Sequence, residues 1–290
     1  MNPPPALEVT ALEKHYPRFA LGPLDLTVPA GSIYGLIGPN GAGKTTLIDQ
    51  IFGMGSPDAG TIKVCGLDHE RDEVAVKSCA AYVGPDLNYV AWGKIGRAIR
   101  FVRGFRPTWD EAYCSRLMQE WGISANDRIA TLSFGGRTKL ALLLALAWRP
   151  KVLVLDEPTT GIDAHTKKAV FAELLAIVRD EARTVFISSH QLSDLERFTD
   201  RVGVLHKGRL LAEGATGELV ERHLQAEWES DHTESFTRVP GLTVQEREGS
   251  HWRGVLDTLT CPVASLAQRG ARDVQTQALT LEELFLALTQ

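Results

Sequence analysis

The chain has 290 residues, 44% of them hydrophobic and 23% charged, with 31 Lys and Arg against 36 Asp and Glu and a net charge of −5. This balance is typical of a globular protein and excludes a strongly basic binder, so no nucleic-acid partner is expected. The longest apolar run, residues 140–148, is about half of the ~20 residues that a membrane-spanning helix needs. Residues 1–6 lack the pattern of a secretory signal, which predicts a flexible leader on a soluble, cytosolic chain.

The four cysteines are Cys65, Cys79, Cys114 and Cys261. They are far apart in the sequence and show no CxxC spacing, so neither a zinc site nor a disulfide framework is indicated. Reduced thiols also suit a cytosolic protein.

The first elements lead into a glycine-rich turn. Residues 7–16 and 24–28 are predicted to be strands, and residues 32–37 form a short apolar run typical of a buried strand. A helix is expected from Lys44 to about Gly53 directly after the turn. Strand, glycine loop and helix together make the phosphate-loop unit.

The next elements alternate between strands and helices. Short strands around a charged helix are expected in 61–83, helices in 93–121, an apolar helix in 134–148, a helix after residue 163, and strands at 152–155, 184–187 and 202–205. This alternation predicts a mostly parallel sheet that is covered on both faces.

Residues 218–290 differ from the rest of the chain in charge and in their pattern of predicted elements. Residues 218–290 hold 12 acidic residues and six Arg but no Lys, which leaves residues 1–217 near +1. Strands are expected at 242–245, 252–256 and 274–278, with helices at 262–268 and 281–288. In the last helix, apolar residues recur at i, i+3, i+4 and i+7, which marks one buried face. We therefore predict a main domain over residues 7–217 and a small accessory domain over 218–290.

The glycine-rich turn matches the phosphate-binding pattern G-x-x-x-x-G-K-[ST]. Its residues are Gly38, Pro39, Asn40, Gly41, Ala42, Gly43, Lys44, Thr45 and Thr46. In this motif, backbone N–H groups surround the phosphates at a helix N-terminus. Lys44 is expected to reach the β- and γ-phosphates, and Thr45 to offer its hydroxyl to Mg²⁺.

A second motif, residues 152–158, is an apolar strand that ends in two carboxylates. Ligands of open α/β sheets bind outside the carboxyl ends of the strands. We expect Asp156 to hold Mg²⁺ and Glu157 to polarise a water molecule that attacks the γ-phosphate.

These motifs, together with Leu132-Ser-Phe-Gly-Gly-Arg137, resemble the ATP-binding subunit of an ATP-binding cassette (ABC) transporter. The third segment is similar to the family signature LSGGQ, and the resemblance covers about residues 7–213. It implies a P-loop α/β fold with an antiparallel β edge layer, a helical insert over about 84–147 and a small C-terminal α+β appendage. It also implies an ATPase that uses ATP and Mg²⁺.

The resemblance assigns further positions. The signature residues Ser133, Gly135 and Gly136 would contact ATP bound to a second subunit, and a Ser at a helix start is also a natural anion site. Asp163 is similar to the aspartate of the loop that crosses the dimer interface. His190 resembles the catalytic switch histidine that contacts the γ-phosphate, beside Glu157 and Lys44, and Tyr16 would stack on adenine.

Two positions depart from the family pattern. Phe134 stands at the first Gly of the signature and Gly136 at its Gln, while Ser133 and Gly135 are retained. Where the family has a glutamine that helps to order the metal, this chain has Pro85 or Asp86. Proline offers no ligand, whereas Asp86 is a candidate metal ligand.

The resemblance implies partners and a location. Aromatic residues between about 84 and 122 would form either a groove for a cytoplasmic helix of a membrane-spanning permease subunit or part of the core. The closing helix resembles that of ABC-2 type exporter subunits. The chain would be a peripheral protein at the cytoplasmic face of the inner or plasma membrane. Its second ATP-binding subunit would be a copy of itself or a diverged sister chain.

Two other functions remain open at the level of sequence. One is a soluble mechanochemical ABC ATPase, although such proteins usually have two cassettes, a coiled-coil insertion or zinc cysteines, which this chain lacks. The other is the ATPase of a membrane complex that regulates without transporting.

Overall fold

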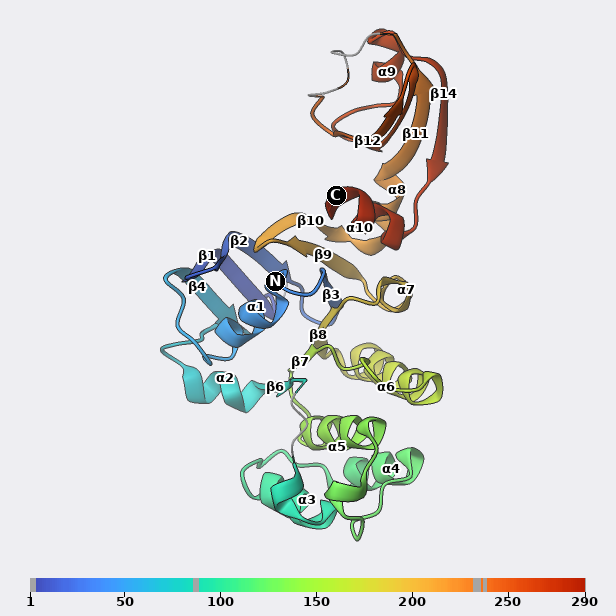
Figure 1. Ribbon diagram of the computed structural model, residues 1–290. Helices are drawn as coiled ribbons and strands as arrows, with labels where there is room; N and C mark the ends of the chain where they lie inside the picture. Colours follow the sequence, from blue (N-terminus) through green and yellow to red (C-terminus); the bar gives the residue numbers. More distant parts are fainter. Residues whose placement is uncertain (1–3, 86–88, 232–235, 237–238, 290) are drawn as a thin grey trace.

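The computed structural model describes residues 4–85, 89–231, 236 and 239–289. Three sheets lie within these ranges (Figure 1). Asp86, one of the predicted metal ligands, lies outside the described residues.

The central sheet has the strand order β10-β9-β3-β8-β7-β6. Its strands are β3 (Ile33–Ile37), β6 (Ala80–Val83), β7 (Val152–Asp156), β8 (Thr184–Ser189), β9 (Arg201–His206) and β10 (Arg209–Ala215). Every pairing from β9 to β6 is parallel, and only β10 runs antiparallel to its neighbour. The carboxyl ends of β3, β7 and β8 therefore meet at one edge, which confirms the predicted parallel sheet.

An antiparallel sheet forms a separate layer, in the order β2-β1-β4-β5. Its strands are β1 (Leu7–Tyr16), β2 (Phe19–Val28), β4 (Ala59–Val64) and β5 (Leu67–Asp68). β2 begins earlier than predicted because it pairs with β1 as a hairpin up to Tyr16 and Phe19. The leader predicted through residue 6 ends earlier, since Ala6 is buried and its N–H donates to the Val28 carbonyl at 2.9 Å.

Helices cover both faces of the central sheet. α1 (Lys44–Ile51) packs between it and the antiparallel layer, whereas α5 (Phe134–Leu146) and α6 (Ala164–Glu181) cover the opposite face. Because side chains alternate along a strand, Ile33 and Ile37 of β3 join the α5 side while Tyr34 and Leu36 join the α1 side. The remaining helices of residues 4–215 are α2 (Glu73–Cys79), η1 (Val90–Trp92), α3 (Ile95–Gly104), α4 (Glu111–Trp121), η2 (Ile129–Thr131) and α7 (Leu192–Leu195).

The C-terminal module comprises residues 216–289. Its elements are α8 (Thr216–Arg222), β11 (His223–Glu229), β12 (Leu242–Glu248), β13 (His251–Asp257), α9 (Ala264–Gln268), β14 (Arg272–Ala278) and α10 (Leu281–Thr289), with an antiparallel sheet in the order β12-β13-β11-β14. β10 and β11 were not predicted. β11 buries His223, Ala226 and Trp228, which are unevenly spaced, so its sequence lacks the regular alternation that predicts a strand.

The last helix returns to the main part of the molecule, as Figure 1 shows. Leu281 and Leu284 are fully buried in the same cluster as the residues of α5 and α7. The predicted boundary between residues 217 and 218 falls inside α8. The division into two domains therefore stays a prediction, although the C-terminal module has a small core of its own.

Candidate active site

The glycine-rich turn links β3 to the N-terminus of α1. Gly41 and Gly43 have φ values of 80° and 111°, which favour glycine. A Cβ at Gly38 would lie 2.4 Å from the Leu205 carbonyl oxygen, so only glycine fits there. No side chain caps the start of α1 at Gly43. The first backbone N–H groups of the helix are thus left for an anion, which the helix dipole also favours.

Lys44 brings a buried positive charge to this loop. Its Nζ donates to the carbonyl of Gly38 at 2.7 Å and to that of Pro39 at 3.3 Å, and forms an ion pair with Glu157 Oε1 at 3.2 Å. A cavity of about 470 Å³ opens here, lined by Arg18, Phe19, Asn40, Gly41, Ala42, Gly43, Lys44, Thr45, Thr46 and Glu157. The phosphate loop, Lys44 and Glu157 thus line the same cavity.

Thr45 and Asp156, the two predicted Mg²⁺ ligands within the described residues, lie together. The Thr45 hydroxyl donates to Asp156 Oδ2 at 2.7 Å, and the Ser188 hydroxyl donates to Asp156 Oδ1 at 2.5 Å. Mg²⁺ prefers such hard oxygen ligands and takes the rest of its shell from substrate phosphates and water. The residues present therefore fit a Mg²⁺ ion that would be held by Thr45 and Asp156.

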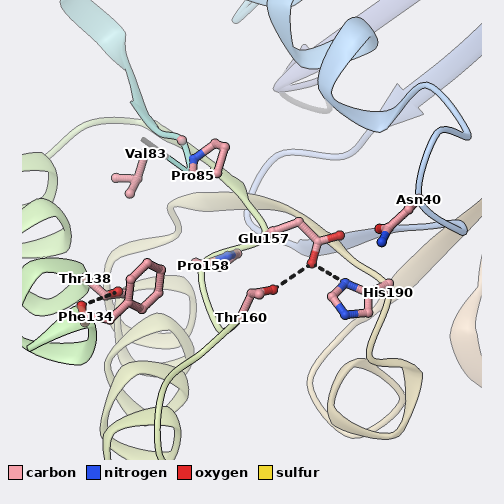
Figure 2. A pocket seen from close by; sticks show the side chains of 10 residues that line it. Asn40, Val83, Pro85, Phe134, Thr138, Glu157, Pro158, Thr160 and His190 are labelled. Carbon is pink, nitrogen blue, oxygen red and sulfur yellow. Dashed lines mark hydrogen bonds and ion pairs between the residues drawn. The ribbon is translucent and has the colours of Figure 1, made fainter. Parts of the chain in front are cut away.

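Glu157 is held in an unusual backbone conformation at the end of β7. Its φ of 52° is in the left-handed region, which is costly for a residue other than glycine and is found mostly at functional sites. Its N–H donates to the Ser188 hydroxyl at 3.0 Å. Its Oε2 accepts from the Thr160 hydroxyl at 3.1 Å and lies 2.7 Å from His190 Nδ1 (Figure 2). The structure thus brings together Glu157, Lys44 and His190, the three predicted catalytic residues.

Glu157 also lines a second cavity, whose side chains are drawn in Figure 2. Its volume is about 250 Å³, and its lining residues are Asn40, Val83, Gly84, Pro85, Phe134, Thr138, Glu157, Pro158, Thr160 and His190. The cavity joins the end of β6, the start of α5 and the acidic end of β7. Pro85, one of the two positions at which a glutamine was expected, lines it but brings neither a hydrogen-bond donor nor a side-chain oxygen.

The predicted signature residues lie at the start of α5, and Asp163, predicted in the loop that crosses the dimer interface, lies at the start of α6. The Ser133 hydroxyl caps α5 by accepting from the Gly136 N–H at 3.1 Å. Asp163 caps α6 by accepting from the N–H and hydroxyl of Thr166 at 2.9 and 2.7 Å, and these hydrogen bonds hold its pKa below the usual value. Ser133, Gly135, Gly136 and Asp163 do not line the phosphate-loop cavity of their own chain.

Four residues of the site differ from the prediction, one displaced and three missed. Tyr16 is not among the residues lining the phosphate-loop cavity; its ring is 47% exposed and the Lys14 ammonium lies 5.8 Å from its centre. Arg18, in the turn that follows, and Phe19, the first residue of β2, line the cavity instead. Ser188, which holds both acidic residues of β7, was also missed. Its only signal was a polar residue at the end of an apolar strand.

A parallel sheet with a phosphate loop facing paired carboxylates defines the class of P-loop ATPases. Residues 21–160 match the family "ABC transporter". Nod factor export ATP-binding protein I of Burkholderia lata is 31% identical to this chain over 94% of this chain and 92% of its own length. The daunorubicin/doxorubicin resistance ATP-binding protein DrrA of Streptomyces peucetius is 35% identical over 75% of this chain and 68% of its own.

Solved structures agree with these relatives. One titled "Structure of ATP binding subunit of ABC transporter" superposes with a TM-score of 0.69 at 25% identity and covers 74% of this chain and 92% of that chain. This chain therefore belongs to the ABC transporter family, as one of its ATP-binding subunits. Within the ranges described above, no helix combines the length and apolar character needed to cross a membrane.

Proposed function

We propose that this chain hydrolyses ATP to power an ABC exporter whose membrane-spanning permease is a separate protein. The observation that carries the ATPase step is the contact of Glu157 with both Lys44 and His190, beside the Thr45–Asp156 pair. The chain would act as a peripheral subunit at the cytoplasmic face of the inner or plasma membrane. The names of the export and drug-resistance relatives support this direction of transport.

The residues divide the chemistry between them. The N–H groups at the start of α1 and the Lys44 ammonium bind the β- and γ-phosphates. Mg²⁺ at Thr45 and Asp156 would neutralise charge on these phosphates. Glu157 orients the attacking water and accepts its proton, while His190 and Thr160 hold the Glu157 carboxylate in place. Lys44 also pairs with Glu157 at 3.2 Å, which keeps the base beside the phosphate-binding ammonium.

A complete site would need two chains. Because Ser133 and Gly135 do not line their own phosphate-loop cavity, we propose that they contact ATP held by a second subunit. That subunit is either another copy of this chain or a diverged sister. Binding of ATP would close the pair, and hydrolysis would reopen it.

Replacement of the proposed base tests the ATPase step. Glu157→Gln keeps the shape of the side chain but removes its basicity, so we expect ATP turnover to fall by about 10²- to 10⁴-fold while ATP still binds. Phosphate release and equilibrium binding measure the two quantities. Glu282→Gln, an exposed change in α10, is the matched control. Undiminished turnover in Glu157→Gln would remove the role given to Glu157.

A groove beside the helical insert supports a permease as partner. Its volume is about 340 Å³, and its lining residues include Tyr82, Tyr89, Val102, Arg106 and Trp148. The Trp92 ring packs against Phe101 at a tilt of 47°, and Phe101 contacts Phe105 at a centroid distance of 4.9 Å. Phe101 and Phe105 are 47% and 69% exposed, whereas Tyr89, Trp92 and Trp109 pack partly against the core. The predicted aromatic residues are therefore divided between core and surface.

The partner is tested by affinity purification of the tagged chain from detergent-solubilised membranes of its native cell. We expect a stoichiometric multi-span protein, lost when Phe101 and Phe105 are changed to Ser. It should be retained in the control Leu259→Ser, which removes an exposed apolar side chain from the C-terminal module. Recovery of only ribosomes or nucleic acid would instead indicate a mechanochemical ATPase and overturn the membrane partner.

A further inference from the structure

One serine hydroxyl joins the two acidic residues at the end of β7. Ser188 lies on β8, and the parallel pairing of β7 with β8 places it opposite Asp156. Its hydroxyl donates to Asp156 Oδ1 at 2.5 Å and accepts from the Glu157 N–H at 3.0 Å. A hydroxyl has one proton to donate and two lone pairs that can accept, so both hydrogen bonds form at once. A single side chain therefore links a candidate Mg²⁺ ligand to the proposed base.

Burial makes these two hydrogen bonds hard to replace. Ser188 is 0% exposed and Asp156 is 1% exposed. A hydrogen bond is stronger where water is excluded, and a buried group that loses its partner gains no contact with water in exchange. Without the Ser188 hydroxyl, Asp156 Oδ1 would lose this donor and the Glu157 N–H would lose its acceptor.

The donation to Oδ1 fixes the orientation of the Asp156 carboxylate. The other oxygen, Oδ2, accepts from the Thr45 hydroxyl at 2.7 Å and so stays beside the second candidate Mg²⁺ ligand. Pro85 brings no side-chain oxygen, so among the described residues Mg²⁺ would depend on Thr45 and Asp156. Residues that hydrogen-bond to a metal ligand typically contribute about 10- to 100-fold to metal affinity or activity. The orientation of Asp156 by Ser188 therefore matters for the metal.

The same hydroxyl holds the backbone of Glu157. The φ of 52° at this residue is a costly conformation that persists only where surrounding contacts impose it. The hydrogen bond from the Glu157 N–H to Ser188 is one such contact. At the other end of the side chain, the Glu157 carboxylate contacts Thr160 and His190 (Figure 2). The base is thus fixed at its backbone by Ser188 and at its carboxylate by the other two residues.

From this geometry we propose that Ser188 is a positioning residue that orients Asp156 for Mg²⁺ and Glu157 for the attacking water. In this role, which rests on the proposed ATPase function, Ser188 acts only through its two neighbours. It lines neither the phosphate-loop cavity nor the cavity drawn in Figure 2. Loss of its hydroxyl should therefore weaken the use of Mg²⁺ and slow hydrolysis. The contacts of ATP with Lys44 and the loop N–H groups, which need no metal, should remain.

The test compares Ser188→Ala with Thr184→Val in the full chain. Thr184 is a matched control, because it is a buried residue of the same strand whose hydroxyl accepts from the Gly31 N–H at 2.9 Å, away from the site. Titration calorimetry measures ATP affinity in EDTA and at increasing Mg²⁺ concentration. Ser188→Ala should match the unaltered protein in EDTA but need about 10- to 100-fold more Mg²⁺ to reach the same ATP affinity. Thr184→Val should match it in both conditions, and an equal Mg²⁺ requirement in the two variants would overturn the proposal.

Two further variants separate positioning from folding. Ser188→Cys has nearly the same size but only a weak donor, so it should behave like Ser188→Ala and tests the same hydrogen bonds if the alanine variant does not fold. Ser188→Thr keeps the hydroxyl and should restore the Mg²⁺ requirement. A Cys variant that uses Mg²⁺ normally would contradict the role of the hydroxyl.

Turnover distinguishes this role from the ATPase step itself. At saturating ATP and Mg²⁺, Ser188→Ala should hydrolyse ATP about 10- to 100-fold more slowly than Thr184→Val. If the two variants turn over equally while Glu157→Gln is slow, the positioning role is wrong and the ATPase step stands. If Glu157→Gln is fully active, the proposed base is wrong, and the Mg²⁺ titration still decides whether Ser188 orients Asp156.

Discussion

The nucleotide site and the C-terminal module are stabilised by different kinds of contact. Around the phosphate loop, charged and polar side chains hold one another: Lys44 pairs with Glu157, and Ser188 binds Asp156. In the C-terminal module, aromatic rings form the centre instead, with Trp228 and Trp252 stacked at 6.1 Å. Charged groups that are paired in a cavity can exchange partners with a ligand, whereas packed rings cannot. The contrast therefore separates a region held by polar contacts from one held by aromatic packing.

The two regions meet through α10. Leu281 and Leu284 are buried beside Leu192 and Leu195 of α7, the helix that follows His190 in the chain. Figure 1 shows α10 lying near α8 and β10, away from α9 and the far end of the module. The following changes test how far the two regions behave independently.

The largest expected effect is on the stability of the C-terminal module. Trp228→Ala removes a fully buried ring that contacts Phe236 and Trp252, and should lower the free energy of unfolding by about 3–5 kcal/mol. Denaturant unfolding measures this, and ATP affinity of the folded fraction should be unchanged. Trp228→Phe, which keeps a ring, should lose less. A large loss of ATP affinity would show that the regions are coupled.

The phosphate loop should respond in the opposite way. Lys44→Ala removes the ammonium expected to contact the phosphates, so ATP affinity should fall by about 10- to 100-fold, the value of one hydrogen bond to a charged group. Titration calorimetry measures the dissociation constant. Lys63→Ala, an exposed lysine of β4, is the control and should bind ATP normally. Retained affinity in Lys44→Ala would contradict the assignment of the loop.

Loss of the cap of α5 should have a smaller effect. Ser133→Ala removes the hydroxyl that accepts from the Gly136 N–H and should cost about 1 kcal/mol of unfolding free energy. Ser133→Asn keeps a capping oxygen and should restore stability. If Ser133 also contacts ATP across a dimer, Ser133→Ala should reduce turnover without weakening ATP binding to a single chain. Equal stability of the Ala and Asn variants would show that the cap contributes nothing.

The smallest expected effect is a pH dependence at the joint between α8 and β11. Burial lowers the pKa of His223 below its ordinary value of 6.5, partly offset by its contact with the Leu219 carbonyl. The unfolded chain therefore binds this proton more readily. Stability is complete above pH 6.5 and falls as the pH drops toward the folded pKa. Between pH 8 and pH 5, the melting temperature of His223→Gln should decline less steeply than that of the unaltered protein. The control His251→Gln should decline as steeply as the unaltered protein, because His251 is exposed.

Much of the fold could be predicted from local sequence patterns. The glycine loop, the acidic end of β7 and the apolar face of α10 each depend on residues within a few positions of one another, so spacing alone was enough to recognise them. The prediction missed strands β10 and β11 and helices α7 and α8. The two strands are partly exposed, and charged residues interrupt their alternation. Their pairing with β9 and β13 decides their conformation, and pairing is not a local property.

The sequence by itself determined the phosphate-loop class, the candidate Mg²⁺ ligands Thr45 and Asp156, and the candidate base Glu157. Only the tertiary structure decided that Ser188 holds both acidic residues from 32 and 31 positions away, and that Phe19 rather than Tyr16 lines the loop cavity. The physical reason is that strand order, which is set by burial of the whole sheet, brings distant residues together, whereas a sequence pattern records only near neighbours.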